Sequence, residues 1–279
     1  MADPHFVPPS ETMYAKVSSA EKKSHLDFND IPGFTRAVNA IDHALFVPEG
    51  RVYAGLFGWN NTPGAILISP GITGRAHFTM YLAEMGAGGA SARPPAGVER
   101  FVFVIKGQCT VTGVGGAAHA LVANDFAFFP ADFAHVISST TGAELVMFER
   151  KYQAPEGNTA RPTFQTGSTD SQPILPCPPE VFGLRKLLPQ SSEYDFNVHI
   201  MDFNPGEYLV VKENHYNQHG LLLLEGQGIY RLSDKWYPVQ NGDAIWMAPF
   251  VTQWYAALGK ERSRYILYKD TFRDPLHLY

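Results

Sequence analysis

The sequence predicts an all-β protein built from two tandem copies of one β-sandwich or β-barrel unit. Short apolar or alternating runs are separated by Gly, Pro, Asn or Asp roughly every eight to twelve residues, a spacing typical of such folds. Helical periodicity is hard to find anywhere in the 279 residues. Two linked motifs also recur at a near-constant offset, because Gly107 and Gly226 are 119 positions apart and Asp125 and Asp243 are 118 apart. This offset indicates an internal duplication.

Four segments follow one another along the chain. Residues 1–40 are predicted to be an N-terminal arm, and residues 41–153 the first copy. Residues 154–180, rich in Pro, Gly, Ser and Thr, are unsuited to a sheet interior and are expected to connect the copies. Residues 181–279 are the second copy. An arm of this kind can pair with a partner's sheet edge, which favours a homo-oligomer, a dimer or larger.

Composition excludes several classes of protein. The chain is 45% hydrophobic, enough for one or two buried cores, and its net charge of −5 argues against a nucleic-acid binder. No run approaches the roughly 18–20 apolar residues of a membrane helix, and the start lacks the pattern of a secretory signal. Cys109 and Cys177 lie far apart, outside any CxxC pair, as expected of reduced thiols. We therefore expect a cytoplasmic protein that acts on a small molecule, without nucleic-acid or membrane partners.

The most informative stretch is ENHYNQH, residues 213–219, which holds Glu213, His215 and His219 at i, i+2 and i+6. Alternation along a strand points such residues to one side. Oxygen and nitrogen donors without a thiolate suit Mn²⁺, Fe²⁺, Zn²⁺ or Ni²⁺. The alternative is a pair of strand histidines that happen to lie near a glutamate. The sequence favours a metal site.

The spacing around this stretch resembles the two motifs of the cupin jelly roll, in its two-domain, bicupin form. The three residues stand at ligand positions between Gly206 and Gly226, with the family's six residues before the second glycine. The second motif places a ligand eleven residues after Gly242, which is Gln253. The resemblance therefore implies two jelly-roll β-barrel domains and a metal bound by Glu213, His215, His219 and Gln253. An amide oxygen is a weak last ligand, so the metal's identity stays open.

The first copy has lost the corresponding donors. Pro94, Ala96 and Arg100 stand at three of its ligand positions, and only His135 remains at the fourth. Proline and alanine offer no side-chain donor, and arginine is a cation that repels a metal. We predict that the N-terminal cupin binds no metal and that His135 is a hydrogen-bonded pocket histidine.

A closer resemblance covers nearly the whole chain after about residue 40. The stretch KENHYNQHGLLLLEGQGIYRLSDKWYPVQNGDAIWMAPFVTQWY, followed by RSRYILYKDTFRDP, is similar to the C-terminal cupin of the (S)-ureidoglycine aminohydrolases. These enzymes of purine and allantoin degradation are also labelled glyoxylate-induced proteins. The resemblance implies an enzyme that binds Mn²⁺, with another divalent metal as the alternative. It also implies release of ammonia from (S)-ureidoglycine to give (S)-ureidoglycolate.

Two side chains are candidates for proton transfer in that reaction. Glu213 would stand beside the substrate as a metal-bound carboxylate. In RYILYKD the residues Tyr265, Leu267 and Lys269 share one strand face, and a barrel-lining Lys269 would have its pKa lowered by burial and by the dication. From the residues alone, a solvated lysine at the strand end is the alternative, and the resemblance reverses that preference.

Tyr230, Tyr265 and Gln253 are candidate substrate-binding residues, because hydroxyl and amide groups can bond a carboxylate or ureido group. The two tyrosines could equally be aromatic core residues. Trp246 and Trp254 are expected to serve packing. Two other functions stay open: a different cupin metalloenzyme, a dioxygenase or isomerase acting on a small carboxylic acid, and a non-catalytic bicupin that binds a small acid.

Overall fold

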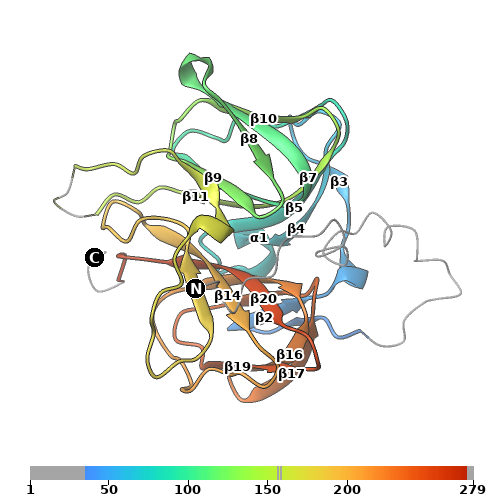
Figure 1. Ribbon diagram of the computed structural model, residues 1–279, viewed down its shortest axis with the longest axis vertical. Helices are drawn as coiled ribbons and strands as arrows, with labels where there is room; N and C mark the ends of the chain where they lie inside the picture. Colours follow the sequence, from blue (N-terminus) through green and yellow to red (C-terminus); the bar gives the residue numbers. More distant parts are fainter. Residues whose placement is uncertain (1–34, 156, 158, 275–279) are drawn as a thin grey trace, which may run out of the picture.

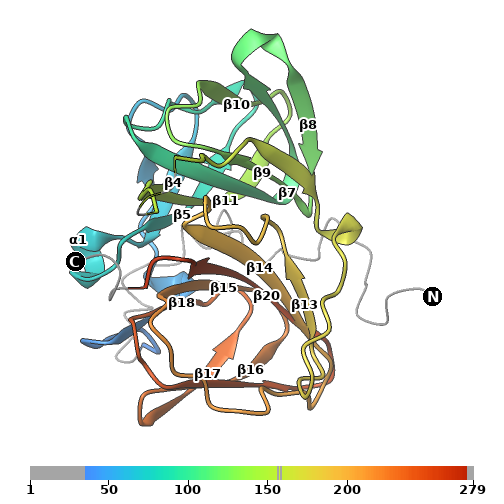
Figure 2. The ribbon, with the colours of Figure 1, turned by 90° about the vertical axis from the view of Figure 1, so that its left-hand side faces the viewer.

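Strands dominate the protein, and they form two β-barrels stacked along its long axis (Figures 1 and 2). The structure is a computed structural model that describes residues 35–155, 157 and 159–274. In those residues the only α-helix is the four-residue α1 (Pro70–Thr73), and no helix is long and apolar enough to cross a membrane. The all-β fold class predicted from the sequence is confirmed.

The N-terminal barrel is a ten-stranded sheet that folds over on itself through the long strand β7 (Val98–Gly113). The first half of β7 pairs with β9 (Asp125–Phe129) and β11 (Ala143–Lys151), and its second half pairs with β8 (Ala118–Val122) and β10 (His135–Ser139). The remaining strands are β3 (Ala54–Gly55), β4 (Pro63–Ile68), β5 (Thr79–Met85), β6 (Gly89–Ala90) and β12 (Gln165–Ser168).

The C-terminal barrel has a seven-stranded sheet in the order β1-β2-β18-β15-β20-β14-β13 and a three-stranded sheet in the order β17-β16-β19. The larger sheet consists of β1 (Val38–Asn39), β2 (His43–Phe46), β13 (Gly183–Lys186), β14 (Phe196–Phe203), β15 (His219–Glu225), β18 (Ala244–Met247) and β20 (Ser263–Asp270). The smaller one consists of β16 (Gln227–Leu232), β17 (Lys235–Gln240) and β19 (Gln253–Leu258). Every residue of β14 is buried, because one face lines the barrel and the other meets the N-terminal barrel.

The two barrels exchange strands, which changes the domain boundaries expected from the sequence. The sequence predicts that residues 41–153 form the N-terminal cupin, but β2 pairs with β18 of the C-terminal barrel. Conversely, β12 lies within the expected connection 154–180 and pairs with β9 of the N-terminal barrel. In Figure 2 the blue β-strands beside β18 show the first exchange. The reason is physical: a short strand can complete either of two nearby sheet edges, and covering both edges protects them.

Of the expected arm, residues 1–40, the part up to residue 34 lies outside the described residues. Its last part forms β1, which pairs with β2 through Val38 and Asn39. Arg36 then ties this segment to the C-terminal barrel, because its guanidinium donates to Asp243 Oδ1 at 2.9 Å and also contacts Oδ2. The segment before the first barrel is thus anchored on the second.

The duplication is visible at the two hairpin glycines. Gly107 and Gly226 both adopt a positive φ, +75° and +77°. A side chain at either position would collide with the backbone just before the neighbouring strand, at Gly142 before β11 and at Arg262 before β20. A β-bulge lies beside each glycine, in the pairing of β11 with β7 and of β15 with β20. Only glycine allows both the positive φ and the close backbone contact. This explains why both copies have glycine here, 119 positions apart.

Three apolar cores hold the molecule together. One fills the N-terminal barrel, and a second fills much of the C-terminal barrel around Tyr230, Tyr255 and Tyr265. The third lies between the barrels, where Phe78 stacks on Tyr268 with ring centroids 3.9 Å apart. Because this third core is as continuous as the interiors, the barrels pack as one unit.

Candidate active site

Backbone pairing brings the predicted metal ligands together in the C-terminal barrel. Glu213 and Gln253 form an isolated antiparallel bridge, with N–O distances of 2.9 and 3.0 Å in the two directions. His219 is the first residue of β15, and Gln253 is the first of β19. His215 lies in the segment between Glu213 and His219, where its carbonyl accepts a hydrogen bond from Phe250 N at 2.8 Å. The four residues therefore converge from two strand ends and one loop.

Three nitrogen atoms of this cluster form a triangle. His215 Nε2, His219 Nε2 and Gln253 Nε2 lie 3.3 Å from one another, and Glu213 Oε2 lies 3.8 Å from His215 Nε2. Two donors about 2.1 Å from a shared ion lie roughly 3.0–3.4 Å apart, so the imidazole spacing fits a metal. Among the described residues no three His, Cys, Asp or Glu side chains make a metal-binding group by themselves, and the cluster depends on the Gln253 amide.

The Gln253 amide is turned differently from the prediction. Its nitrogen faces the two imidazoles, while its oxygen accepts a long 3.5 Å hydrogen bond from the Tyr230 hydroxyl. A metal is bound by the amide oxygen, because the amide nitrogen has no free electron pair. A half-turn of the amide exchanges the two atoms without moving the rest of the side chain.

The electrostatics of the cluster suit deprotonated donors. Burial lowers the pKa of His219 far below its ordinary value, and the nearby Lys269 lowers it further, so its imidazole is neutral. Burial works to raise the pKa of Glu213, but His215 and Lys269 more than offset this and hold it below its usual range. A neutral imidazole and an ionised carboxylate are the forms that bind a metal.

A cavity of about 240 Å³ inside the barrel adjoins the cluster. Tyr265, Leu267 and Lys269 of β20 all line it, as the predicted alternation requires. Tyr230 also lines it, and the side chains of Tyr230 and Tyr265 are almost completely buried. Burial lowers the pKa of Lys269, while the Glu213 carboxylate opposes that change. All predicted site residues except His215 therefore line this cavity, and His215 joins through the triangle.

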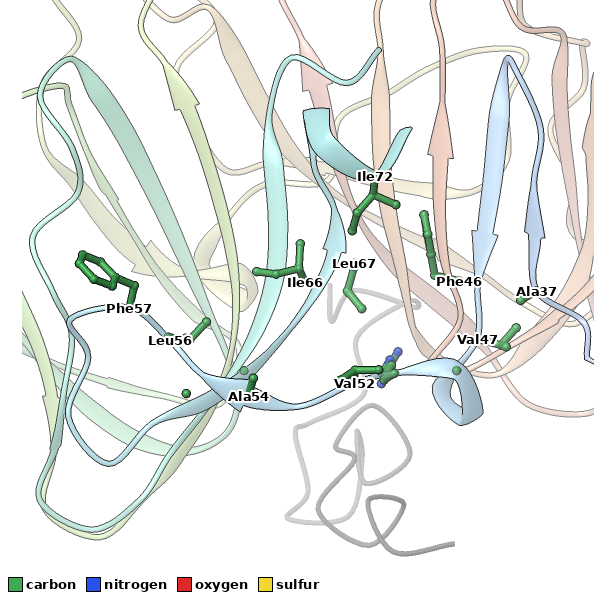
Figure 3. A pocket seen from close by; sticks show the side chains of 14 residues that line it. Ala37, Phe46, Val47, Val52, Ala54, Leu56, Phe57, Ile66, Leu67 and Ile72 are labelled. Carbon is green, nitrogen blue, oxygen red and sulfur yellow. The ribbon is translucent and has the colours of Figure 1, made fainter. Parts of the chain in front are cut away.

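A larger hollow of about 570 Å³ lies elsewhere, where the chain crosses from the C-terminal sheet to the N-terminal barrel (Figure 3). Apolar side chains such as Phe46, Leu67 and Ile72 line it, and Arg51 is its one charged lining residue. It holds no acid, imidazole or hydroxyl that could bind or move a proton. The cavity beside Glu213 adjoins the predicted metal ligands and is the candidate active site.

Comparison with known proteins shows the family. The EutQ-like cupin domain matches residues 73–152. A probable (S)-ureidoglycine aminohydrolase of Oryza sativa subsp. japonica is 60% identical over 247 residues, which cover 88% of this chain and 79% of that protein. The (S)-ureidoglycine aminohydrolase of Arabidopsis thaliana is 57% identical over 253 residues, 91% of this chain and 83% of that protein. This chain belongs to the (S)-ureidoglycine aminohydrolase family.

A solved structure supports the same family. The putative glyoxylate-induced protein of Pseudomonas aeruginosa superposes with a TM-score of 0.77 and is 28% identical, and the alignment covers 86% of this chain and 92% of that one. The family and the two-barrel fold predicted from the sequence motifs are thus confirmed.

Sequence reasoning missed two further side chains that line the cavity. His199 of β14 and Lys186 of β13 lie directly opposite each other in the sheet and line the cavity. His199 is 6% exposed, and its Nε2 has no hydrogen-bond partner among the described residues. Burial lowers its pKa far below the usual value, and the neighbouring Lys269 and Lys186 lower it further. The alternation of Asn197, His199 and Met201 in FNVHIMDF was the available signal.

In the N-terminal barrel an arginine lies where a ligand would be expected. The Arg100 guanidinium donates to Glu149 Oε1 at 2.6 Å and lies 3.3 Å from His135 Nε2. His135 stacks on Phe129 with centroids 3.6 Å apart, and burial lowers its pKa to about 4. Its Nδ1 lies 2.8 Å from the Phe133 carbonyl oxygen. A fixed organic cation thus fills the position at which the other barrel gathers its donors.

Proposed function

We propose that this protein hydrolyses (S)-ureidoglycine to (S)-ureidoglycolate and ammonia in its C-terminal barrel, with a divalent cation, Mn²⁺, as cofactor. The observation that carries the proposal is the convergence of Glu213, His215, His219 and Gln253 beside Lys269. The choice of substrate follows the relatives that are 57–60% identical over about nine-tenths of this chain, which are named (S)-ureidoglycine aminohydrolases.

The donor set fits a hard or borderline divalent ion. One carboxylate, two imidazoles and an amide oxygen, without thiolate, are suited to Mn²⁺ more than to a soft metal. Glu213, His215, His219 and Gln253 would hold the ion. When bound, it would supply Lewis acidity and a fixed point for the substrate's carboxylate and amine.

In the reaction, the bond between the substrate's central carbon and its amine breaks, and a bond from water oxygen to that carbon forms. Water gives up one proton, and the departing amine takes up one. Glu213 is ionised and half-buried, and we assign it as the base that accepts the proton from water. The Lys269 ammonium lies in the same cavity, and we assign it as the acid that protonates the amine.

The cavity walls would orient the substrate and exclude bulk water. The hydroxyls of Tyr230 and Tyr265 lie in an apolar setting that raises the pKa of each far above its ordinary value, so both remain neutral donors. Neutral hydroxyls can bond a carboxylate or ureido oxygen without adding charge. A cavity of about 240 Å³ suits a substrate of this small size.

The test is direct. The Mn²⁺-reconstituted protein is mixed with freshly prepared ureidoglycine, and ammonia and the chirality of ureidoglycolate are followed together. We expect ammonia well above the spontaneous rate and a single enantiomer of product. Ammonia at the spontaneous rate only would refute the proposal. Oxygen uptake with small carboxylic acids would instead favour the cupin dioxygenase considered above.

A further inference from the structure

The residues that follow Lys269 and precede His219 point away from the cavity. Lys269 and His219 are direct cross-strand partners in β20 and β15. Because successive strand residues point to opposite sides, their neighbours Asp270 and Gln218 are directed toward the N-terminal barrel. These neighbours are also bonded to each other, since Asp270 N donates to Gln218 O and Gln218 N donates to Asp270 Oδ2, both at 3.3 Å.

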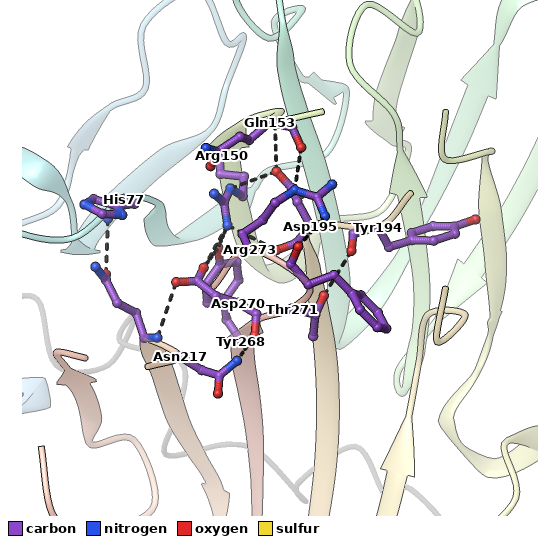
Figure 4. A network of polar contacts seen from close by, with 12 residues as sticks. His77, Arg150, Gln153, Tyr194, Asp195, Asn217, Tyr268, Asp270, Thr271 and Arg273 are labelled. Atoms are coloured by element: carbon purple, nitrogen blue, oxygen red, sulfur yellow. Dashed lines mark hydrogen bonds and ion pairs between the residues drawn. The ribbon is translucent and has the colours of Figure 1, made fainter. Parts of the chain in front are cut away.

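The Asp270 carboxylate is held by an arginine of the other barrel. Arg150, in β11, donates from one guanidinium nitrogen to Asp270 Oδ1 at 2.8 Å and to the Tyr268 hydroxyl at 2.9 Å. Arg150 Nε also lies 3.2 Å from Asp195 Oδ2. Figure 4 shows Arg150 reaching across to Asp270, Tyr268 and Asp195. Asn217, two residues before His219, donates to the Asp270 carbonyl, which completes the contact.

Gln218 is held from the same side. Its amide oxygen accepts a hydrogen bond from His77 N at 3.2 Å, and its amide nitrogen donates to Arg75 O at 3.0 Å. Both partners belong to the segment between β4 and β5 of the N-terminal barrel. Both neighbours of the Lys269–His219 pair are therefore anchored on the barrel in which three of the four ligand positions lack donors.

We propose that the N-terminal barrel is a positioning element for the active site, in which Arg150, acting through Asp270, fixes Lys269 relative to His219. This inference rests on the proposed function. Removing Arg150 leaves Asp270 as a buried carboxylate without its cation, which costs more than the loss of one hydrogen bond. The end of β20 then relaxes, and displacements of about 1 Å in a catalytic group can cost about 100-fold in rate.

Arg150→Met is the test, and Arg273→Met is its matched control. The two arginines are buried alike in the interface, but Arg273 donates to the carbonyls of Gln153, Ser192 and Phe272 and has no contact with Asp270. We expect both variants to lose stability. Only Arg150→Met should lower kcat, by roughly 10–100-fold with little change in KM, and weaken Mn²⁺ binding, as loss of a supporting residue does.

Asp270→Asn gives a second, independent route. It keeps an oxygen that can accept from Gln218 N but removes the charge that binds Arg150. We expect a similar loss of kcat, and the double variant should be less impaired than the product of the two single losses, because no buried carboxylate is left unpaired. If Arg150→Met does not fold, the kcat of Asp270→Asn tests the inference alone.

Two outcomes overturn the inference. One is equal kcat and Mn²⁺ affinity in Arg150→Met and Arg273→Met, and the other is strict additivity in the double variant. If wild-type protein released no ammonia, the proposed function would fail. The Mn²⁺ titration of the variants would still test whether Arg150 positions His219.

Discussion

Replacing Glu99 by glutamine tests whether a proton is buried between the barrels. Glu99 lies in β7, is completely buried, and faces Asp195 of the other barrel. Neither Glu99 oxygen has a hydrogen-bond donor among the described residues, and the same is true of Asp195 Oδ1. Burial, and after it the neighbouring Asp195, raise the pKa of Glu99 to about 10 against the opposing effect of Arg150 and Arg273. One proton between the two carboxyls satisfies both.

The local charge count supports this assignment. Arg150 and Arg273 bring two positive charges to the interface, and Asp195, Asp270 and Glu99 bring three acids. With Glu99 protonated, the charges balance. An ionised Glu99 would leave one buried negative charge unpaired, which proteins avoid by shifting a pKa.

The magnitude follows from linkage. Between a pKa of 4.5 in the unfolded chain and about 10 in the fold, the native state holds a proton that the unfolded state has lost. Stability therefore falls as pH rises through this window, by about 1.4 kcal/mol per pH unit. At pH 7 the protein has lost about 3 kcal/mol of folding stability in this way, relative to a pH below the unfolded pKa of Glu99. Glutamine resembles the protonated acid and removes this loss of stability. Its second amide N–H lacks a partner, however, and that unsatisfied donor costs about 1 kcal/mol.

We therefore expect Glu99→Gln to stabilise the protein by about 2 kcal/mol at pH 7. Urea unfolding of both proteins between about pH 5.5 and about pH 7.5 measures the difference, which should grow by about 1.4 kcal/mol per pH unit. Glu261→Gln, at an exposed position, is the control and should show neither effect. A destabilised Glu99→Gln at pH 7, or a difference that does not change with pH, refutes the buried proton.

Three further predictions concern the active site directly. His215→Ala should strip the metal, measured by elemental analysis, and abolish ammonia release, because it removes a donor of the triangle; retained metal would remove His215 from the ligand set. Lys269→Met should keep the metal and lose about 100-fold or more in kcat, the range of general acid–base catalysis, and unchanged turnover would exclude Lys269 from proton transfer. Elemental analysis of the wild type should find about one metal ion per chain, since Arg100 fills the N-terminal position, and two would contradict this.

Local rules carried much of the prediction. Turn spacing and the paired glycines gave the duplicated β fold, because positive φ and close backbone approach restrict Gly107 and Gly226 in any such barrel. Alternation placed Lys269 on the barrel face, and motif spacing placed Gln253 opposite Glu213 across 40 positions of sequence. These features depend on backbone periodicity and motif spacing, which can be recognised directly from the sequence.

Features that depend on long-range packing were out of reach. Nothing in HALF or QTGS tells which barrel edge these strands complete, because either edge accepts a short strand with the right alternation. His199 was missed because a histidine amid apolar residues is common in a core, and only the fold shows that it lines the same cavity as Glu213. The partnership of Arg150 with Asp270 spans 120 positions and two domains, and no local pattern records it.

Strand β20 explains how a barrel that has lost most of its metal donors is still coupled to the active site of the other barrel. Its alternate residues serve two surfaces: Tyr265, Leu267 and Lys269 face the cavity, while Tyr268 and Asp270 face the N-terminal barrel. Because one strand forms part of both surfaces, any shift of the barrel interface also moves the cavity wall. Such coupling needs no ligand in the N-terminal barrel, only its packing and Arg150. Loss of the metal-binding residues there would be tolerated, whereas loss of its interface would not.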